Sequence, residues 1–490
     1  MVKPDSKRIR TRFAPSPTGT PESIHLGFVI RALWSYAYAK KNKGKFVLRI
    51  EDTDQKRSRK DTEEEIYEVL KKFGISWDEG PDVGGDYGPY RQSERLGKYQ
   101  EAAKKLVEKG YAYYDFDAPK REKEEIKEAY DSKEKLAVLK VRPEARNGNL
   151  EEAKKRIANG DPYVVRVKIP EDKVFEYEDW ILKKKIKFFG KEVSDLILLK
   201  SDGFPTYHLA VVVDDIAMKI SHVFRGQEWI SSTPIHLYLY EGLGEQIPAI
   251  GHFSVILDPR TGKKFSKRDM TALFGVNTWL TKGYLPEAIL NYLMLLGWAP
   301  KDNREIFSLN EFVEVFDEDG VQKANPVFDT AKLDWFNGEY IRKLSVEDLK
   351  NRFRTLSEKF AVVSDEKQTE ITKLIQERIK TLKDIDTFAG FFFEEPKKEE
   401  VSALLLNPES VKHLEIAIHE IEGAGEWKIE TLNDNFMAKI KENNFKTGDF
   451  FMSLRIAITG SKFTPPINES ILILGKDESL KRLRNALNKD

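Results

Sequence analysis

The first fifty residues contain two strand-like segments separated by a turn and a helix-forming segment. Residues 8–13 and 45–50 are apolar and β-branched enough for strands, and residues 14–19 form a turn rich in Pro and Gly. Between the turn and the second strand, Leu26, Ile30 and Leu33 recur at the spacing of one helix face up to residue 40. The order predicts a β-α-β unit and therefore an α/β fold. Acidic residues 51–54 follow the second strand, at the sheet edge where such folds bind ligands.

The chain is too long for one hydrophobic core, so several domains are expected from its 490 residues. Residues 119–159 are very rich in Lys and Glu, which fits either solvated helices or a surface that contacts RNA. Strand-like segments at 163–169, 196–199, 210–213 and 220–224 predict that the sheet resumes after this insertion. From residue 277 the pattern becomes helical. We therefore expect five segments, at 1–90, 91–195, 196–260, 261–344 and 345–490.

Two helix starts are indicated by capping residues. Thr62 and Glu65 have the spacing of a capping box, and Ser345 and Asp348 have a similar one. The second opens a Leu/Lys/Glu-rich region that we expect to be helical to the end of the chain.

Composition excludes some classes of site and location. Cysteine is absent, so disulfides and thiolate zinc sites are excluded, and the seven histidines show no paired ligand spacing. We expect no structural metal. No apolar run reaches the length of a membrane helix and the N-terminus lacks a secretory apolar core, so a cytoplasmic location is expected. Lys plus Arg equals Asp plus Glu, at 81 each, so any RNA site must be a local basic patch.

Two short segments have the residues of a phosphate-binding site. HLG (residues 25–27) opens the first helix, where backbone N–H groups favour phosphate and Gly27 would allow a nucleotide to approach. His25 could donate a hydrogen bond there, although a histidine at this position can equally cap the helix or pack in the core. KKFSKR (residues 263–268) concentrates cations that could stabilise a departing pyrophosphate, or could form an ordinary basic surface.

Taken together, these segments resemble the signature pair of the class I aminoacyl-tRNA synthetases. The motifs RFAPSPTG, RIEDTD, SDGFPTYHLAVVVDD, FRGQEW, STP and FDTAKLDWFNGEYIR are similar, in order and spacing, to those of the bacterial-type glutamyl-tRNA synthetases. The resemblance extends through LRIAITG and ILGKDESLKRL near the C-terminus. It implies a Rossmann-like catalytic domain interrupted by a domain that binds the tRNA acceptor stem, then a stem-contact region containing the KMSKS-type loop, then an all-helical anticodon-binding domain. The expected activity is glutamate activation by ATP, followed by transfer to tRNA(Glu).

The resemblance implies a set of glutamate-binding residues. Arg12 and Arg225 would pair with carboxylate through their guanidinium forks. Glu51 would meet the ammonium group, and Ser16 and Tyr207 would supply neutral hydrogen bonds. A purely structural role stays open for Glu51, as do structural ion pairs of the two arginines with neighbouring acidic residues, Asp52, Asp54 or Asp214.

A second set would serve ATP. The resemblance places His25, Gly27, Lys264, Ser266 and Lys267 at the nucleotide, with His25 and the two lysines stabilising the transition state and the pyrophosphate. The substrate carboxylate is already ionised at neutral pH, so it needs no general base. Mg²⁺ is expected to accompany the nucleotide.

The tRNA 3′ end would be contacted by Thr53 and by Trp229, the latter by stacking, although Trp229 could equally belong to the core. Residues 113–117 lie where zinc-containing members have cysteines, so no zinc is expected. The family resemblance also implies a monomer.

Three questions remain open in the sequence. The segment Thr-Pro-Glu-Ser-Ile before His25 is longer than usual in the family and either bulges outward or shifts the histidine. Charging of tRNA(Gln) besides tRNA(Glu) is undecided. The alternative functions are a small-molecule nucleotidyltransferase, which leaves the helical C-terminal half unexplained, and a non-catalytic tRNA-binding paralogue, which would be expected to have lost His25 or Lys267.

Overall fold

The structure is a computed structural model that describes residues 9–118, 144–265, 274–405 and 407–488. The chain forms two compact units. The first consists of residues 1–278 and 290–329, and the second of residues 279–289 and 330–490. Part of the Lys/Glu-rich segment and of the basic segment, including Ser266 and Lys267, lies outside the described residues.

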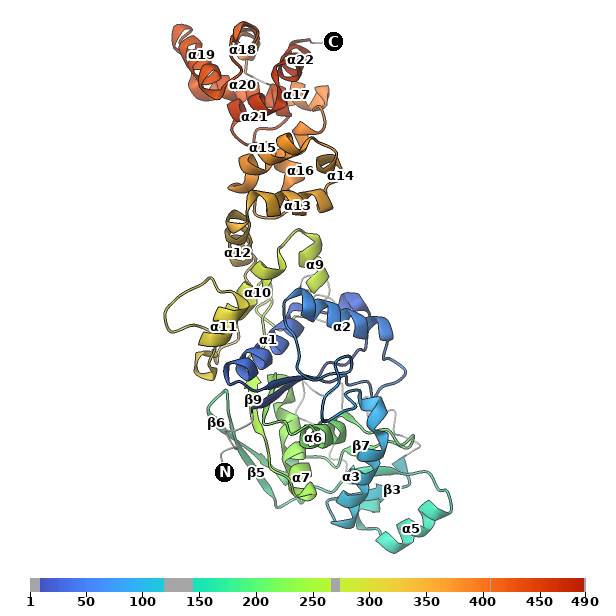
Figure 1. Cartoon of the computed structure of the whole chain (residues 1–490). Coiled ribbons are helices and arrows are strands. Elements are labelled where there is room, and N and C mark those ends of the chain that lie inside the picture. The colour runs from blue at the N-terminus through green and yellow to red at the C-terminus, as the bar shows by residue number, and fades with distance from the viewer. Residues whose placement is uncertain (1–8, 119–143, 266–273, 406, 489–490) are drawn as a thin grey trace. The chain divides into compact units, whose positions relative to one another are not determined.

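A four-stranded parallel sheet forms the centre of the first unit (Figure 1). Its order is β2 (Lys45–Leu48), β1 (Arg10–Phe13), β8 (His222–Gly226) and β9 (Ala249–Phe253). Helix α1 (Leu26–Lys41) connects β1 to β2, so the predicted β-α-β unit is confirmed. The chain reaches β8, on the other side of β1, only after the inserted segment. The carboxyl ends of β1 and β8 therefore lie at a switch point of the strand order, where open α/β sheets bind ligands.

The strands within the insertion form separate sheets. Strands β3 (Ala112–Asp115), β4 (Val164–Val167) and β7 (Ile197–Leu199) make an antiparallel sheet, and β5 (Val174–Asp179) and β6 (Lys184–Phe189) make a hairpin. The strands predicted at 163–169 and 196–199 thus exist but do not continue the parallel sheet as expected. Their apolar pattern predicts a strand and carries no information about the partner strand.

The prediction of a strand at 210–213 is wrong. These residues lie in helix α6 (Tyr207–Ala217), which packs against α3 (Leu96–Glu108) and α7 (Thr233–Leu243). Every residue from Leu209 to Asp215 is buried. Because the helix is covered on all sides, its sequence shows no polar face, and a short apolar run of this kind is indistinguishable from a buried strand.

Helix α2 (Lys60–Lys72) begins before the predicted capping residue. Its N-cap is Arg59, whose side chain makes no capping bond, so Thr62 does not cap the helix. Instead the buried Thr62 hydroxyl donates to the carbonyl of Gly19 at 2.9 Å and ties α2 to the turn that follows β1. The remaining helices around the first unit are α5 (Leu150–Ala158), α9 (Val276–Thr281), α10 (Pro286–Leu295) and α11 (Leu309–Val315), of which α9 and α10 belong partly to each unit.

The second unit is helical throughout its described residues and has its own core of Leu, Ile and Phe side chains. The predicted cap at Ser345 is confirmed: its hydroxyl accepts from the N–H of Asp348 at 3.0 Å. The helices are α12 (Thr330–Lys343), α13 (Val346–Leu356), α14 (Glu358–Ala361), α15 (Asp365–Gln376), α16 (Asp384–Ala389), α17 (Lys398–Leu404), α18 (Ser410–Gly423), α19 (Ile429–Glu442), α20 (Thr447–Thr459), α21 (Ile467–Leu474) and α22 (Lys476–Leu487). No helix in the described part of the chain has the length and apolar content to span a bilayer.

Candidate active site

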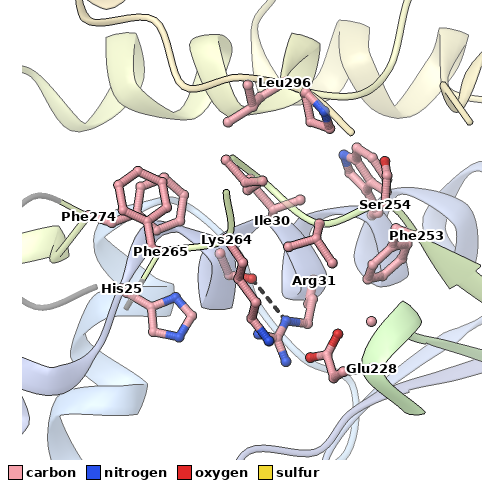
Figure 2. Close-up of a pocket in the computed structure, with 16 residues that line it drawn as sticks. His25, Ile30, Arg31, Glu228, Phe253, Ser254, Lys264, Phe265, Phe274 and Leu296 are labelled. Atoms are coloured by element: carbon pink, nitrogen blue, oxygen red, sulfur yellow. Dashed lines mark hydrogen bonds between the residues drawn. The ribbon is translucent and has the colours of Figure 1, made fainter. Parts of the chain in front are cut away.

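A pocket in the first unit brings both phosphate-type segments together. It is lined by the first turns of α1, by residues at the ends of β8 and β9, and by Lys264 and Phe265 of the basic segment. Figure 2 shows the side chains of Lys264 and Arg31 extending toward the same part of the pocket, near the ring of His25. Two segments far apart in the sequence thus contribute to one site.

The backbone on either side of His25 in the sequence is anchored by hydrogen bonds. The N–H of Leu26 donates to the carbonyl of Phe274 at 2.8 Å, and the N–H of Val276 donates to the carbonyl of Ile24 at 3.0 Å. The imidazole stacks on Phe274, with ring centroids 6.1 Å apart. Although His25 is the N-cap residue of α1, its side chain makes no capping hydrogen bond. The capping alternative is therefore excluded in this geometry.

The electrostatics of the pocket keep His25 uncharged. Burial, together with the charges of Arg31 and Lys264, lowers the pKa of His25 to about 3. Its buried Nδ1 has no hydrogen-bond partner among the described residues. At neutral pH the ring is therefore a neutral donor placed among cations.

The residues inserted before His25 form a surface turn. Pro21–Ser23 make one turn of 3-10 helix that packs beside α2, and Thr20 and Glu22 are exposed. The following Ile24 is buried and carries the backbone bond to Val276. The extra length thus lies outside the pocket, and His25 lines the pocket together with Lys264.

Sequence reasoning missed two charged residues of this pocket, Arg31 and Glu228. The Nε of Arg31 donates to the carbonyl of Gly27 at 3.1 Å, one turn earlier on α1. The sequence could have indicated Arg31, because it lies four residues after Gly27 and positions four apart on a helix share a face. Glu228 belongs to the FRGQEW motif, in which only the arginine and the tryptophan had been considered.

A second cluster lies at the neighbouring strand ends and contains Arg12, Glu51, Tyr207 and Arg225; we call it the arginine cluster. Arg225 is buried at the end of β8, and each of its three nitrogens donates to an uncharged acceptor. Nε donates to Nε2 of His252 at 2.8 Å, Nη1 to Nδ1 of His236 at 2.9 Å and Nη2 to the hydroxyl of Thr233 at 2.7 Å. The structural ion pair considered for Arg225 is not formed, and its guanidinium has no carboxylate partner among the described residues.

Arg12 does form an ion pair, with an acidic residue that was not considered. Its Nε lies 3.2 Å from Oδ1 of Asp215, not beside Asp52, Asp54 or Asp214. The same oxygen accepts from Nη1 of Arg49 at 2.7 Å, and Nη2 of Arg49 donates to Glu51 at 3.1 Å. Arg49 thereby connects Arg12 and Glu51 through one buried network.

Burial and charge set the protonation of the cluster. Burial raises the pKa of Glu51 above its ordinary value, while Arg49 and Arg12 act against this rise. Burial raises the pKa of Tyr207 to about 12, and the charges of Arg225, Glu51 and Arg12 also act on its phenol. Tyr207 is therefore a neutral hydroxyl among these charges. The arginine cluster contains four of the five predicted glutamate-binding residues.

Ser16, Thr53 and Trp229 lie around this cluster. Ser16 is exposed on the turn after β1, and that turn is joined to Glu51 because the Glu51 N–H donates to the carbonyl of Pro15 at 2.8 Å. Thr53 is half-buried. The half-buried Trp229 ring lies against Tyr207, with centroids 4.2 Å apart and planes tilted by 36°. Trp229 thus packs against Tyr207 and is not enclosed in the core.

Residues 8–335 match the catalytic domain of the class I tRNA synthetases (E and Q), and residues 320–487 match an anticodon-binding domain. A glutamate–tRNA ligase of Finegoldia magna is 41% identical over 98% of this chain and 99% of the relative. The chain belongs to the glutamate–tRNA ligase family of class I tRNA synthetases. A further member, from Caldicellulosiruptor saccharolyticus, is 38% identical over 98% of this chain and 99% of its own length.

Solved structures of this family agree in fold. The crystal structure of a glutamate tRNA ligase from Elizabethkingia meningosepticum, in complex with its amino acid, has a TM-score of 0.86 and 35% identity over 98% of this chain and 99% of that one. The glutamate-tRNA synthetase from Elizabethkingia anophelis gives a TM-score of 0.85 at 36% identity. The family resemblance and the fold class read from the sequence are thereby confirmed.

Proposed function

We propose that the chain activates L-glutamate with ATP to form glutamyl-adenylate and pyrophosphate, and then transfers the glutamyl group to the 3′ end of tRNA(Glu). The observation that carries the choice of amino acid is the bonding of Arg225. Its buried guanidinium is surrounded by neutral acceptors, so its positive charge is available to a substrate carboxylate. In a glutamate–tRNA ligase fold, such a charge favours an acidic side chain over a neutral one.

Glutamate has two carboxylates and one ammonium group to be recognised. We assign the carboxylates to Arg12 and Arg225, and the ammonium to Glu51. Within the described residues, Nε of Arg12 donates to Asp215 and Nη1 donates to the carbonyl of Phe224 at 3.4 Å, which leaves its Nη2 for the substrate. Tyr207 and Ser16 supply neutral hydrogen bonds. The roles rest on the juxtaposition of these groups in the arginine cluster.

The first step needs positioning and charge stabilisation only. The ionised α-carboxylate attacks the α-phosphorus, and negative charge accumulates on the departing pyrophosphate. Lys264, with Lys267 and Ser266 on the same basic segment, would hold that leaving group, and His25 would donate to phosphate oxygen as a neutral ring. Arg31 would also bind the phosphates, since it lines the same pocket.

Mg²⁺ would accompany ATP and neutralise part of the phosphate charge. No group of three or more His, Cys, Asp or Glu side chains suited to a metal occurs among the residues that the structure describes. Among the described residues, the pocket lining contains one carboxylate, Glu228, so phosphate oxygens and water would supply most of the Mg²⁺ ligands. That the enzyme needs no zinc remains a prediction.

The second step transfers the glutamyl group to the tRNA. We assign Trp229 and Thr53 to its 3′-terminal adenosine, residues 91–195 to the acceptor stem, residues 261–344 to the stem contact, and residues 345–490 to the anticodon. Residues 1–90 and 196–260 would form the catalytic domain. We also propose that the enzyme is a monomer and that it is located in the cytoplasm.

The deciding experiment is aminoacylation of tRNA(Glu) and tRNA(Gln) transcripts with radiolabelled glutamate. Charging of tRNA(Glu) alone identifies a discriminating enzyme, and charging of both identifies a non-discriminating one. If neither is charged, while ATP still binds, the proposal is wrong and a non-catalytic paralogue remains. Glutamate-dependent ATP–pyrophosphate exchange in the presence of tRNA(Glu) tests the first step separately.

A further inference from the structure

The hydrogen bonds of Arg225 fix the proton positions on two buried histidines. A guanidinium can only donate, so Nε2 of His252 and Nδ1 of His236 must both be unprotonated acceptors. The proton of His252 is therefore on Nδ1, and that of His236 is on Nε2. Both rings are neutral, and burial together with the charge of Arg225 lowers the pKa of each.

Each of these two N–H groups points to a hydrogen-bond partner on the side of the ring away from Arg225. Nδ1 of His252 donates to Oδ2 of Asp179 at 2.5 Å, and Nε2 of His236 lies 3.2 Å from Nδ1 of His208. Asp179 is fully buried where β5 ends, and its other oxygen accepts from the N–H groups of Ile181 and Leu182. The hairpin turn between β5 and β6 thus holds the carboxylate in place.

We propose that Asp179, His252 and His236 are positioning residues that orient Arg225 and leave its charge uncompensated for the glutamate carboxylate. The inference deepens the proposed function and rests on its assignment of Arg225. Asp179 acts at one remove: it holds the proton of His252 on Nδ1, so that Nε2 faces the guanidinium as an acceptor. A carboxylate in direct contact with Arg225 would orient the guanidinium equally well. It would also neutralise the positive charge that would otherwise bind the substrate carboxylate.

The orientation of Arg225 and its positive charge are separate properties, and isosteric variants distinguish their effects experimentally. His236→Asn keeps a neutral acceptor close to the position of Nδ1, whereas His236→Asp puts a carboxylate there. His252→Gln and His252→Glu form the corresponding pair, because their terminal oxygen reaches the position of Nε2. Within each pair size and shape are the same, and only the charge differs.

The test is the KM for glutamate in ATP–pyrophosphate exchange with tRNA(Glu) present, measured beside the KM for ATP. We expect His236→Asp to have a KM for glutamate about tenfold or more above that of His236→Asn, since hydrogen bonds between charged groups are about twice as strong as neutral ones. The KM for ATP should be the same in both. Equal glutamate KM values within both pairs would overturn the inference.

Asp179→Asn tests the outer part of the network. Asn can donate to Nδ1, which stabilises the other tautomer of His252 and turns an N–H toward Arg225. We expect a higher KM for glutamate with an unchanged KM for ATP, and an unchanged glutamate KM would remove Asp179 from the proposal. Thermal unfolding of each variant identifies any that do not fold, and the other pair then decides.

Arg225→Ala distinguishes this inference from the proposed function on which it rests. If that variant binds glutamate as the wild type does, the assignment of Arg225 itself is wrong. If its KM rises while the charged and neutral variants behave alike, only the role of the neutral acceptors fails.

Discussion

A methyl group on Gly27 would lie 3.1 Å from Nδ1 of His25 and 3.3 Å from the Phe274 ring. The space that a side chain at this position would need is thus occupied by the histidine, and Gly27 also lines the pocket. Gly27 allows the imidazole to lie against the first turn of α1.

Gly27→Ala should therefore displace His25 without harming the helix. Alanine favours a helix over glycine by about 1 kcal/mol, so the thermal midpoint should stay the same or rise. The rate of ATP–pyrophosphate exchange should fall by about tenfold or more, because small displacements of catalytic groups are costly. Gly97→Ala in α3 is the matched control, since a methyl group there meets nothing within 4 Å. Equal exchange rates in the two variants would contradict this account of Gly27.

Lys264→Ala should slow the first step specifically. Lys264 lines the pocket beside His25, and loss of one preorganised charge at a developing anion costs about 100-fold in kcat. The KM for glutamate should change little. Lys263→Ala is the control, because this exposed neighbour does not line the pocket. An exchange rate for Lys264→Ala like that of Lys263→Ala would remove Lys264 from the site.

Asp215→Asn should destabilise the first unit. Asp215 is buried and its carboxylate compensates Arg12 and Arg49, so neutralising it leaves buried positive charge and should lower the free energy of unfolding by about 3 to 5 kcal/mol. Denaturant unfolding followed by tryptophan fluorescence measures the effect. Asp61→Asn removes an exposed ion pair with Arg59 and should leave the free energy of unfolding nearly unchanged. Similar losses for both would refute the buried network.

The stability of the first unit should fall as the pH falls below 6.5. Burial lowers the pKa of His222 to about 4 from its ordinary value of 6.5, so between these values the unfolded chain binds a proton that the folded chain does not. Each pH unit in that window then costs up to about 1.4 kcal/mol. His222→Asn should reduce the drop in thermal midpoint between pH 7 and pH 5. A drop in His222→Asn as large as that in the wild type would contradict this account of His222.

Local patterns in the sequence predicted the first β-α-β unit, because the Pro/Gly turn at 14–19 and the helix-spaced Leu26, Ile30 and Leu33 separate its two short strands, although every residue of β1 is buried. They failed for α6, where complete burial removes that period. They located β4 and β7 but did not predict the strands that these pair with, which depend on contacts distant in the sequence. The motifs placed Arg12 and Arg225 in one cluster correctly, but no motif indicated that Asp215 and Arg49 would carry the ion pairs. Packing decides which of several nearby charged side chains form ion pairs, and no local sequence pattern shows that packing.

The position of β1 between β2 and β8 has a consequence for synthesis of the chain. The backbone N–H of Arg10 on β1 donates to Ser221, which is 211 positions away. Ribosomes add about 5 to 20 residues per second, so one edge of β1 has no neighbouring strand for about 10 to 40 s after it is made. Throughout that interval the newborn β-α-β unit exposes a strand edge able to pair with other chains. Arg12 and Glu51 are thus synthesised long before Arg225 and before Asp215, the residue that pairs with Arg12.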